Sequence, residues 1–292
     1  MSLPQRRLGD LSVSAIGLGA MPLSVRGEEA AARATATIHA ALDAGVTLID
    51  TADCYAPDGT GLGHNERLVA EALATWDGDS DAVLVATKGG IRREGADWPV
   101  DGRPEWVREA VEGSLQRLGV ERIGLYQHHR PDPAVPYADT IGAFAELVVQ
   151  GKVARVGLSN ADPAQIREAH GILGDALVSV QNRFSPSFRS SRPELELCAE
   201  LGLVFLPWSP LGGISHAGDL GASYADFDAV ARKHDASPQQ VALAWELAQD
   251  DCVVPIPGAS RPETILASLE ALRLTLDADD VARLDASSEE WA

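Results

Sequence analysis

AVLVATK (82–88), RIGLYQHH (122–129) and VARVGLSN (153–160) are three aliphatic runs that end in polar residues, and longer alanine-rich segments separate them. Runs that are apolar almost throughout indicate strands buried on both faces, as in a parallel sheet that helices cover. The same alternation continues in both directions along the chain. It predicts eight strands, at 15–20, 47–52, 82–88, 122–129, 153–160, 177–183, 203–209 and 253–258.

Helical segments lie between these runs, and some begin with strong start signals such as Ser237-Pro238. Eight strand–helix units point to an α/β fold of the closed (β/α)8 type, the TIM barrel, rather than to an open doubly wound sheet. The predicted helices cover 29–44, 66–76, 104–118, 138–150, 163–172, 193–201, 237–249 and 262–271.

Two additions flank the predicted barrel. The segment RRLGDLSVSAIG (6–17) predicts an N-terminal β-hairpin that turns at Gly9-Asp10, and 277–288 predicts an extra C-terminal helix. A barrel of this type needs about 250 residues, and no linker or low-complexity stretch divides the 292 residues. We therefore expect one domain over residues 1–292.

Composition limits the partners and the compartment. The formal net charge of −19 argues against nucleic acid or an anionic membrane as the main partner. No stretch approaches the roughly 18 apolar residues of a membrane span, and the first ten residues lack the apolar core of a secretory signal. Three scattered cysteines suggest a reducing compartment. A cytoplasmic protein is expected, and the composition leaves its oligomeric state open.

Polar residues stand where the predicted strands end, and barrel active sites lie at that rim. Asp50 and Tyr55 follow the second strand, Lys88 ends the third and His129 ends the fourth. Each alone has a structural explanation: a turn-capping carboxylate, a solvent-seeking lysine, a core histidine or a loop tyrosine. Together they indicate a site, because four independent positions would otherwise converge by chance.

These residues stand in motifs that resemble those of the aldo-keto reductases. The resemblance runs from about Arg7 to Leu272 and keeps the family's order. The motifs are DTADCY (50–55), GHNERLVAEAL (63–73), VATKGG (85–90), LYQHHRPD (125–132), GLSN (157–160), QN (181–182), WSPLG (208–212) and PIPGASRPE (255–263).

The resemblance implies reduction of aldehydes or ketones by hydride transfer from a nicotinamide cofactor. It assigns proton donation to Tyr55, tuning of that phenol to Lys88 and Asp50, and orientation of the carbonyl to His129. An ammonium beside a phenol favours the phenolate, so we expect Lys88 to lower the pKa of Tyr55. His128 then points away from the mouth, because successive strand residues face opposite sides. No metal-ligand spacing is evident, and no metal is expected.

For the cofactor, the resemblance implies that Ser159, Asn160 and Gln181 hold the nicotinamide carboxamide while Trp208 stacks on the ring. It gives the pyrophosphate and adenosine end to Ser209, Leu211, Gly258, Ser260 and Arg261. Arg261 is the candidate for a 2′-phosphate contact, since a guanidinium suits phosphate geometry. The expected cofactor is NADPH, and NADH stays possible.

Several positions depart from the family pattern at the adenosine end. Many members carry Lys-Ser at 258–259, Arg at 264 and Glu-Asn at 267–268, whereas this chain has Gly258-Ala259, Thr264, Ala267 and Ser268. Without Glu-Asn, the resemblance gives less support for the usual adenine contacts and for a preference for NADPH.

Four alternatives compete with this interpretation. A Rossmann dinucleotide-binding fold is weakly supported, because GLGAMP (17–22) lacks the third glycine of the dinucleotide fingerprint. A serine hydrolase is also weakly supported, because GLSNA (157–161) lacks the last glycine of a nucleophile elbow. A Schiff-base aldolase is the serious enzymatic rival, because a strand-end lysine such as Lys88 can attack a carbonyl. A non-catalytic nucleotide-binding regulator, resembling potassium-channel β-subunits, is the rival from another class.

Substrate choice is expected to lie in loops. The segment 90–106 is expected to cover the site, and its Trp98 either lines the site or is an ordinary loop aromatic. The chain ends soon after the last predicted helix, without the long C-terminal loop of members that act on steroids. We expect an open pocket for small or medium aldehydes and ketones. Cys54 is expected to be a small packing residue, with oxidation sensitivity as the alternative.

Overall fold

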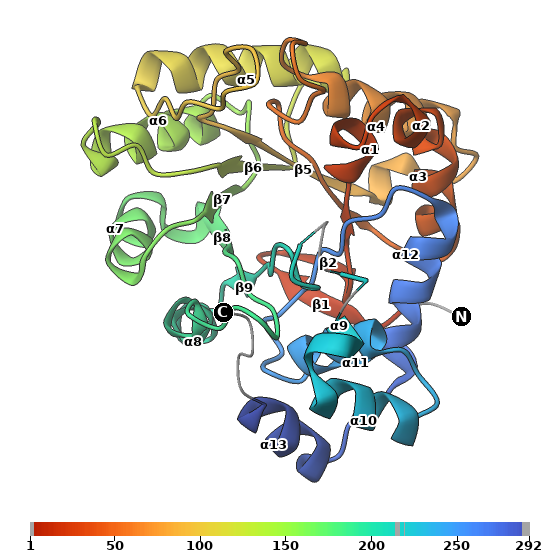
Figure 1. Cartoon of the computed structure of the whole chain (residues 1–292). Coiled ribbons are helices and arrows are strands. Elements are labelled where there is room, and N and C mark those ends of the chain that lie inside the picture. Colours follow the sequence, from red (N-terminus) through yellow and green to blue (C-terminus); the bar gives the residue numbers. More distant parts are fainter. Residues whose placement is uncertain (1–2, 214–216, 219, 288–292) are drawn as a thin grey trace.

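Seven parallel strands follow one another in chain order in the computed structural model, which describes residues 3–213, 217–218 and 220–287. Each strand falls on one of the predicted runs, and the sheet curls into a barrel (Figure 1). The strands are β3 (Leu18–Gly19), β4 (Leu48–Asp50), β5 (Leu84–Gly89), β6 (Leu125–His128), β7 (Val156–Ser159), β8 (Leu177–Gln181) and β9 (Val204–Phe205).

The eighth predicted run, 253–258, closes the barrel without forming a regular strand. Hydrogen bonds join it to both neighbours: Val254 N to Phe205 O at 2.9 Å, Gly17 N to Pro255 O at 2.9 Å and Gly19 N to Pro257 O at 3.0 Å. Pro255 and Pro257 carry no N–H, so this segment only accepts hydrogen bonds on the side of β3. The prediction of an eighth strand was therefore right in position and wrong in regularity.

Helices form a ring around the strands (Figure 1). The prediction of one helix over 29–44 was wrong, because the chain breaks at Arg33 into two helices. The bounds are α1 (Pro22–Val25), α2 (Glu28–Ala32), α3 (Ala34–Asp43), α4 (His64–Thr75), α5 (Pro104–Leu118), α6 (Tyr137–Val149), α7 (Pro163–Leu173), α8 (Arg192–Leu201), α9 (Leu220–Ser223), α10 (Ala225–Lys233), α11 (Pro238–Leu247), α12 (Pro262–Leu269) and α13 (Ala278–Ala286).

Local sequence explains where some of these helices begin. Ser237 Oγ accepts a hydrogen bond from Gln240 N at 3.2 Å, and Gln240 Oε1 accepts one from Ser237 N at 2.8 Å. This reciprocal capping satisfies two backbone donors at the start of α11. The final helix α13 lies inside the predicted 277–288, whose last residue is outside the described part of the chain. No described helix is long and apolar enough to cross a membrane.

The predicted hairpin is present, as β1 (Gln5–Leu8) and β2 (Leu11–Ser14). Gly9 adopts a φ of 58° at the turn, a conformation that glycine tolerates. The buried side chains of Leu8 and Val13 pack against Leu48, Val178 and other residues of the strands. Figure 1 shows the hairpin lying across the centre of the ring. With this side covered, the polar strand ends open at the opposite rim.

Candidate active site

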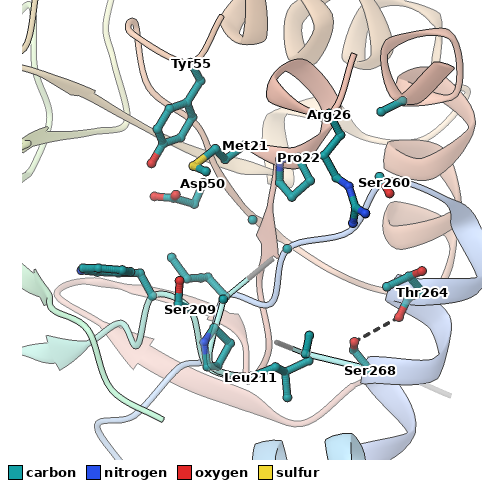
Figure 2. Close-up of a pocket in the computed structure, with 18 of the residues that line it drawn as sticks. Met21, Pro22, Arg26, Asp50, Tyr55, Ser209, Leu211, Ser260, Thr264 and Ser268 are labelled. Atoms are coloured by element: carbon teal, nitrogen blue, oxygen red, sulfur yellow. Dashed lines mark hydrogen bonds between the residues drawn. The ribbon is translucent and has the colours of Figure 1, made fainter. Parts of the chain in front are cut away.

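The carboxyl ends of the strands open into a cavity of about 1200 Å³. Asp50, Tyr55 and His129 line it, and Lys88 lies directly beneath, fully buried. Figure 2 shows the Tyr55 hydroxyl and the Asp50 carboxylate at the same end of this cavity. The four residues singled out from strand ends are therefore neighbours in space.

An ion pair of Lys88 and Asp50 forms the floor of this end. Lys88 Nζ lies 2.8 and 2.7 Å from the two carboxylate oxygens of Asp50 and also donates to the Thr51 carbonyl at 2.9 Å. The side-chain amides of Gln127 and Gln181 donate to Asp50 Oδ1 at 3.1 and 2.7 Å. A buried ion pair needs such additional hydrogen bonds to offset the loss of hydration. The network holds both charges in fixed positions.

Tyr55 stands on the loop after β4, above the ion pair. Lys88 Nζ donates to its hydroxyl at 3.2 Å, and the ammonium lies 4.9 Å from the centre of the phenol ring. The ring of His129 meets it edge-on at 5.7 Å between centroids, and Trp98 lies 6.2 Å away. Phenol, ammonium and imidazole thus meet at one point of the barrel mouth.

The direction of the pKa shift at Tyr55 corrects the expectation drawn from the sequence. Burial raises the pKa of Tyr55 well above its ordinary value, and the negative charge of Asp50 adds to this effect. The expected net lowering is therefore wrong: Asp50 pairs with the ammonium of Lys88 and the phenol is almost fully buried, so these raising effects outweigh any stabilisation of the phenolate by Lys88. Tyr55 is therefore held in its protonated form.

His129 is held neutral. Burial lowers the pKa of His129 well below its ordinary value, and the positive charges of Lys88 and Arg130 add to this effect. Its Nδ1 lies 3.5 Å from Cys54 Sγ, and its backbone N–H donates to the Gly89 carbonyl at 2.9 Å. A neutral imidazole at a cavity wall can donate a hydrogen bond to a carbonyl oxygen without carrying a charge.

The neighbouring His128 lies on the other side of β6. Its ring packs 5.8 Å from Tyr137 and 5.6 Å from Phe144, away from the cavity. Burial lowers the pKa of His128 to about 4. This neutral histidine is part of the packing between the sheet and α6.

Two further side chains of the same loop lie behind Tyr55. Asp53 and Cys54 are both fully buried. Burial raises the pKa of the Asp53 carboxyl well above its ordinary value, and the nearby carboxylate of Glu66 raises it further. Burial raises the pKa of the Cys54 thiol in the same way. Burial thus disfavours the charged form of both groups.

The residues expected to hold the cofactor all lie along the same cavity: Ser159, Asn160, Gln181, Trp208, Ser209, Leu211, Gly258, Ser260 and Arg261. Asn160 and Ser209 adopt φ values of 58° and 53°, which non-glycine residues rarely do. Such conformations persist where the surroundings enforce them, and they are common at binding sites. This cavity is larger than the pockets that bind most small ligands, and it has room for a dinucleotide together with a substrate.

The far end of the cavity suits an anion. Ser260 and Arg261 immediately precede α12 and so lie at the positive end of its helix dipole. The Arg261 side chain donates to Thr264 Oγ1 at 3.2 Å, so its guanidinium lies along the same helix. Figure 2 shows Arg26 reaching from the opposite wall toward Ser260. These donors fit the phosphates of a dinucleotide.

The sequence interpretation missed several residues of this cavity. Met21, Pro22 and Arg26 come from the segment after β3, and Gln239 comes from α11. Met21 and Pro22 belong to GLGAMP, the run that lacks the third glycine of a dinucleotide fingerprint. Its place at the end of the first strand was the usable signal, since every such end faces the same rim.

The expected cover over the site is present in part. Ile91 and Trp98, from the segment 90–106, line the cavity near Tyr55. The Arg93 guanidinium stacks 4.6 Å from the Trp98 ring and donates to the Pro57 carbonyl at 3.2 Å. This stacking fixes Trp98 at the mouth, so the aromatic is a wall of the cavity rather than a free loop residue.

Comparison with known proteins gives consistent matches over nearly the whole chain. The Aldo/keto reductase family model matches residues 15–289. The 6-dehydroglucose reductase of Novosphingobium aromaticivorans is 36% identical, over 94% of this chain and 92% of its own. Probable aldo-keto reductase 1 of Glycine max is 36% identical, over 85% of this chain and 77% of its own.

Solved structures give the same picture. The glycerol dehydrogenase of Gluconobacter oxydans has a TM-score of 0.83 and 27% identity, covering 98% of this chain and 95% of its own. An aldo/keto reductase of Klebsiella pneumoniae, in complex with NADP and acetate, has a TM-score of 0.79 and 25% identity, covering 97% and 94%. The barrel described above is thus the fold of these enzymes.

Proposed function

The chain belongs to the aldo/keto reductase family and is an NAD(P)H-dependent oxidoreductase, and from this we propose that it reduces small and medium aldehydes and ketones, with Tyr55 as proton donor and NADPH as preferred cofactor. One observation carries the proposal: the Tyr55 hydroxyl accepts a hydrogen bond from Lys88 Nζ at 3.2 Å beside His129, at the end of a dinucleotide-sized cavity.

The chemistry follows from these positions. A bound nicotinamide supplies the hydride, and the carbonyl oxygen gains negative charge that must be stabilised as it forms. Tyr55, kept protonated by burial, donates its proton to that oxygen. Lys88 then stabilises the resulting phenolate through its existing hydrogen bond, and neutral His129 orients the carbonyl.

In this proposal, Ser159, Asn160 and Gln181 hold the carboxamide of the nicotinamide, and Trp208 stacks on its ring. Asn160 Nδ2 donates to Ser159 Oγ at 2.9 Å and to the His129 carbonyl at 3.1 Å, which ties this wall to the catalytic end. Ser209, Leu211, Gly258, Ser260 and Arg261 take the phosphates and the adenosine.

The Schiff-base rival fits the geometry poorly. A lysine that attacks a carbonyl must be a free amine that faces the substrate. Lys88 is completely buried, its Nζ is bound to Asp50, Thr51 and Tyr55, and it does not line the cavity. Borohydride treatment with substrate is expected to trap no adduct at Lys88.

Reduction and oxidation are expected to depend on pH in opposite ways. Reduction needs Tyr55 protonated, and its raised pKa keeps it so; we therefore expect kcat/KM for a carbonyl to stay level from about pH 6 to about pH 9. Alcohol oxidation needs the phenolate, whose fraction grows about tenfold per pH unit below the pKa. Steady-state rates in both directions test this. A fall in reduction centred near pH 7 would point to another proton donor.

Cofactor choice is expected to depend on Arg261. If its guanidinium binds the 2′-phosphate, Arg261→Ala removes a charge-assisted contact and should weaken NADPH about 10- to 100-fold. NADH, which lacks that phosphate, should change less than about threefold. Fluorescence titration of both cofactors measures this. Arg273→Ala, which removes an exposed arginine outside the cavity, is the control; equal losses for both cofactors would remove Arg261 from this role.

The deciding experiment is oxidation of NADPH and NADH with a panel of aldehydes, ketones and quinones. Oxidised sugars and glycerol-derived carbonyls belong in it, because similar proteins are named for 6-dehydroglucose and glycerol. We expect turnover with small and medium carbonyls in preference to steroids. Tight NADPH binding without turnover of any carbonyl would favour the nucleotide-binding regulator.

A further inference from the structure

A pocket of potential metal ligands lies behind the catalytic tyrosine. Asp53, Cys54 and His129 each present a ligand atom, and these three atoms lie within 4.8 Å of one another. The carboxylate, thiol and imidazole are all at least nine-tenths buried. Asp53 and Cys54 are adjacent in the chain, whereas His129 comes from the end of another strand. No sequence spacing could therefore have revealed the group.

The ligand spacing suits a transition metal. Cys54 Sγ and His129 Nδ1 are 3.5 Å apart. In a tetrahedral zinc site, bonds of about 2.3 Å to sulfur and about 2.0–2.1 Å to nitrogen place the two atoms about 3.5 Å apart. The existing contact thus has the length of one edge of such a site.

A second and independent feature is the state of Asp53. Both of its carboxylate oxygens are buried, and apart from the interaction with the Cys54 backbone N–H, which lowers the Asp53 pKa, no described residue donates a hydrogen bond of ordinary geometry to them. Buried polar groups nearly always have partners, and those that lack one call for an explanation such as an ion. The positive charge of Lys88 close by is neutralised by Asp50, which lowers its repulsion of a cation.

We propose that Asp53, Cys54 and His129 form a binding site for a borderline or soft divalent cation of the Zn²⁺ or Cd²⁺ class. The ion takes one oxygen of the Asp53 carboxylate, the thiolate sulfur of Cys54 and Nδ1 of His129, and the proton of the Cys54 thiol is released to solvent as it binds. Thiolate and imidazole select such ions over Mg²⁺ or Ca²⁺. Binding itself does not depend on the proposed reductase activity.

Occupancy is expected to stop turnover. The ion binds the ring of His129 and also Cys54, the residue that directly precedes Tyr55. Coordination through Nδ1 fixes the imidazole in its present place beside Tyr55, so the ring can no longer adjust to a bound carbonyl. Zn²⁺ should therefore act as an inhibitor that a chelator reverses, and cofactor affinity should change little.

The test uses Cd²⁺ with the full-length protein. Titration is expected to give the ultraviolet thiolate-to-cadmium charge-transfer absorption, saturating at one equivalent. Cys54→Ala should abolish this band. Asp53→Asn should weaken binding at least about tenfold, since even outer-shell partners are worth about 10–100-fold. Cys252→Ser, which removes a more accessible thiol outside the cluster, should keep both band and stoichiometry.

Metal-free NADPH-dependent turnover and thermal unfolding are measured on the same samples. Turnover in Cys54→Ala that is retained and no longer inhibited by Zn²⁺ would support the site, whereas inhibition that persists would overturn it. The proposal also fails if wild-type protein shows no band, or if Cys252→Ser removes it. Loss of all reductase activity with an intact band would instead sink the proposed function alone.

Discussion

Replacing Tyr55 with phenylalanine is expected to lower kcat about 10²- to 10⁴-fold, the usual contribution of a positioned general acid. The change removes the hydroxyl that Lys88 contacts at 3.2 Å and leaves the ring against His129 and Trp98. NADPH affinity should be retained, because Tyr55 lies at the catalytic end of the cavity. Rapid-mixing measurement of one turnover separates the chemical step from cofactor release.

Tyr137→Phe provides a matched control. It also removes a phenol hydroxyl, from a side chain on α6 that packs beside His128 and does not line the cavity. Its turnover should stay within about twofold of wild type, as expected for a change outside the site. A Tyr55→Phe variant that turns over normally would end the assignment of Tyr55 as proton donor.

Lys88→Met is expected to damage both turnover and stability. Without the ammonium, the Asp50 carboxylate stays buried with only amide donors, and breaking a buried pair costs about 3–5 kcal/mol. Loss of the hydrogen bond that stabilises the forming phenolate should lower kcat about 10²- to 10³-fold, by analogy with removal of an oxyanion donor. Chemical denaturation and single-turnover kinetics measure the two effects separately.

Two variants show whether the effect belongs to the pair. Lys152→Met removes an exposed lysine paired with Glu112 and should cost at most about 1 kcal/mol. The double variant of Asp50→Asn with Lys88→Met removes both charges and should regain part of the lost stability, because no unpaired charge remains. Purely additive losses would mean that the two side chains do not stabilise each other.

Much of the barrel could be predicted because its strands are short, aliphatic and bounded by turns. The failures have physical causes. The break at Arg33 follows no proline or glycine inside the run, so the residues carry no signal for it. The helix α10 was not predicted, although Phe227, Val230 and Ala231 show helical spacing. Pro255 and Pro257 are of a residue type that usually ends a strand, yet their carbonyls accept the hydrogen bonds that close the barrel.

The site was predictable in composition but not in electrostatics. Strand ends face one rim, so Asp50, Tyr55, Lys88 and His129 could be brought together from their positions alone. The pKa of Tyr55 depends on how deeply the phenol is buried and on how fully Asp50 neutralises Lys88, and neither is written in the sequence. Arg26 likewise enters the cavity from a loop whose path only the structure gives.

The closure of the ring by 253–258 has a consequence for biosynthesis. Gly19 and Gly258, which lie on the first and last walls of the cavity, are neighbours where the ring of strands closes. A nascent chain released only as far as α7 already holds Asp50, Tyr55, Lys88 and His129, but it lacks most of the groove for a dinucleotide. Contacts between such distant segments form late and slowly. A ligand that contacts both walls therefore stabilises the closed barrel relative to folding intermediates that lack the last segment.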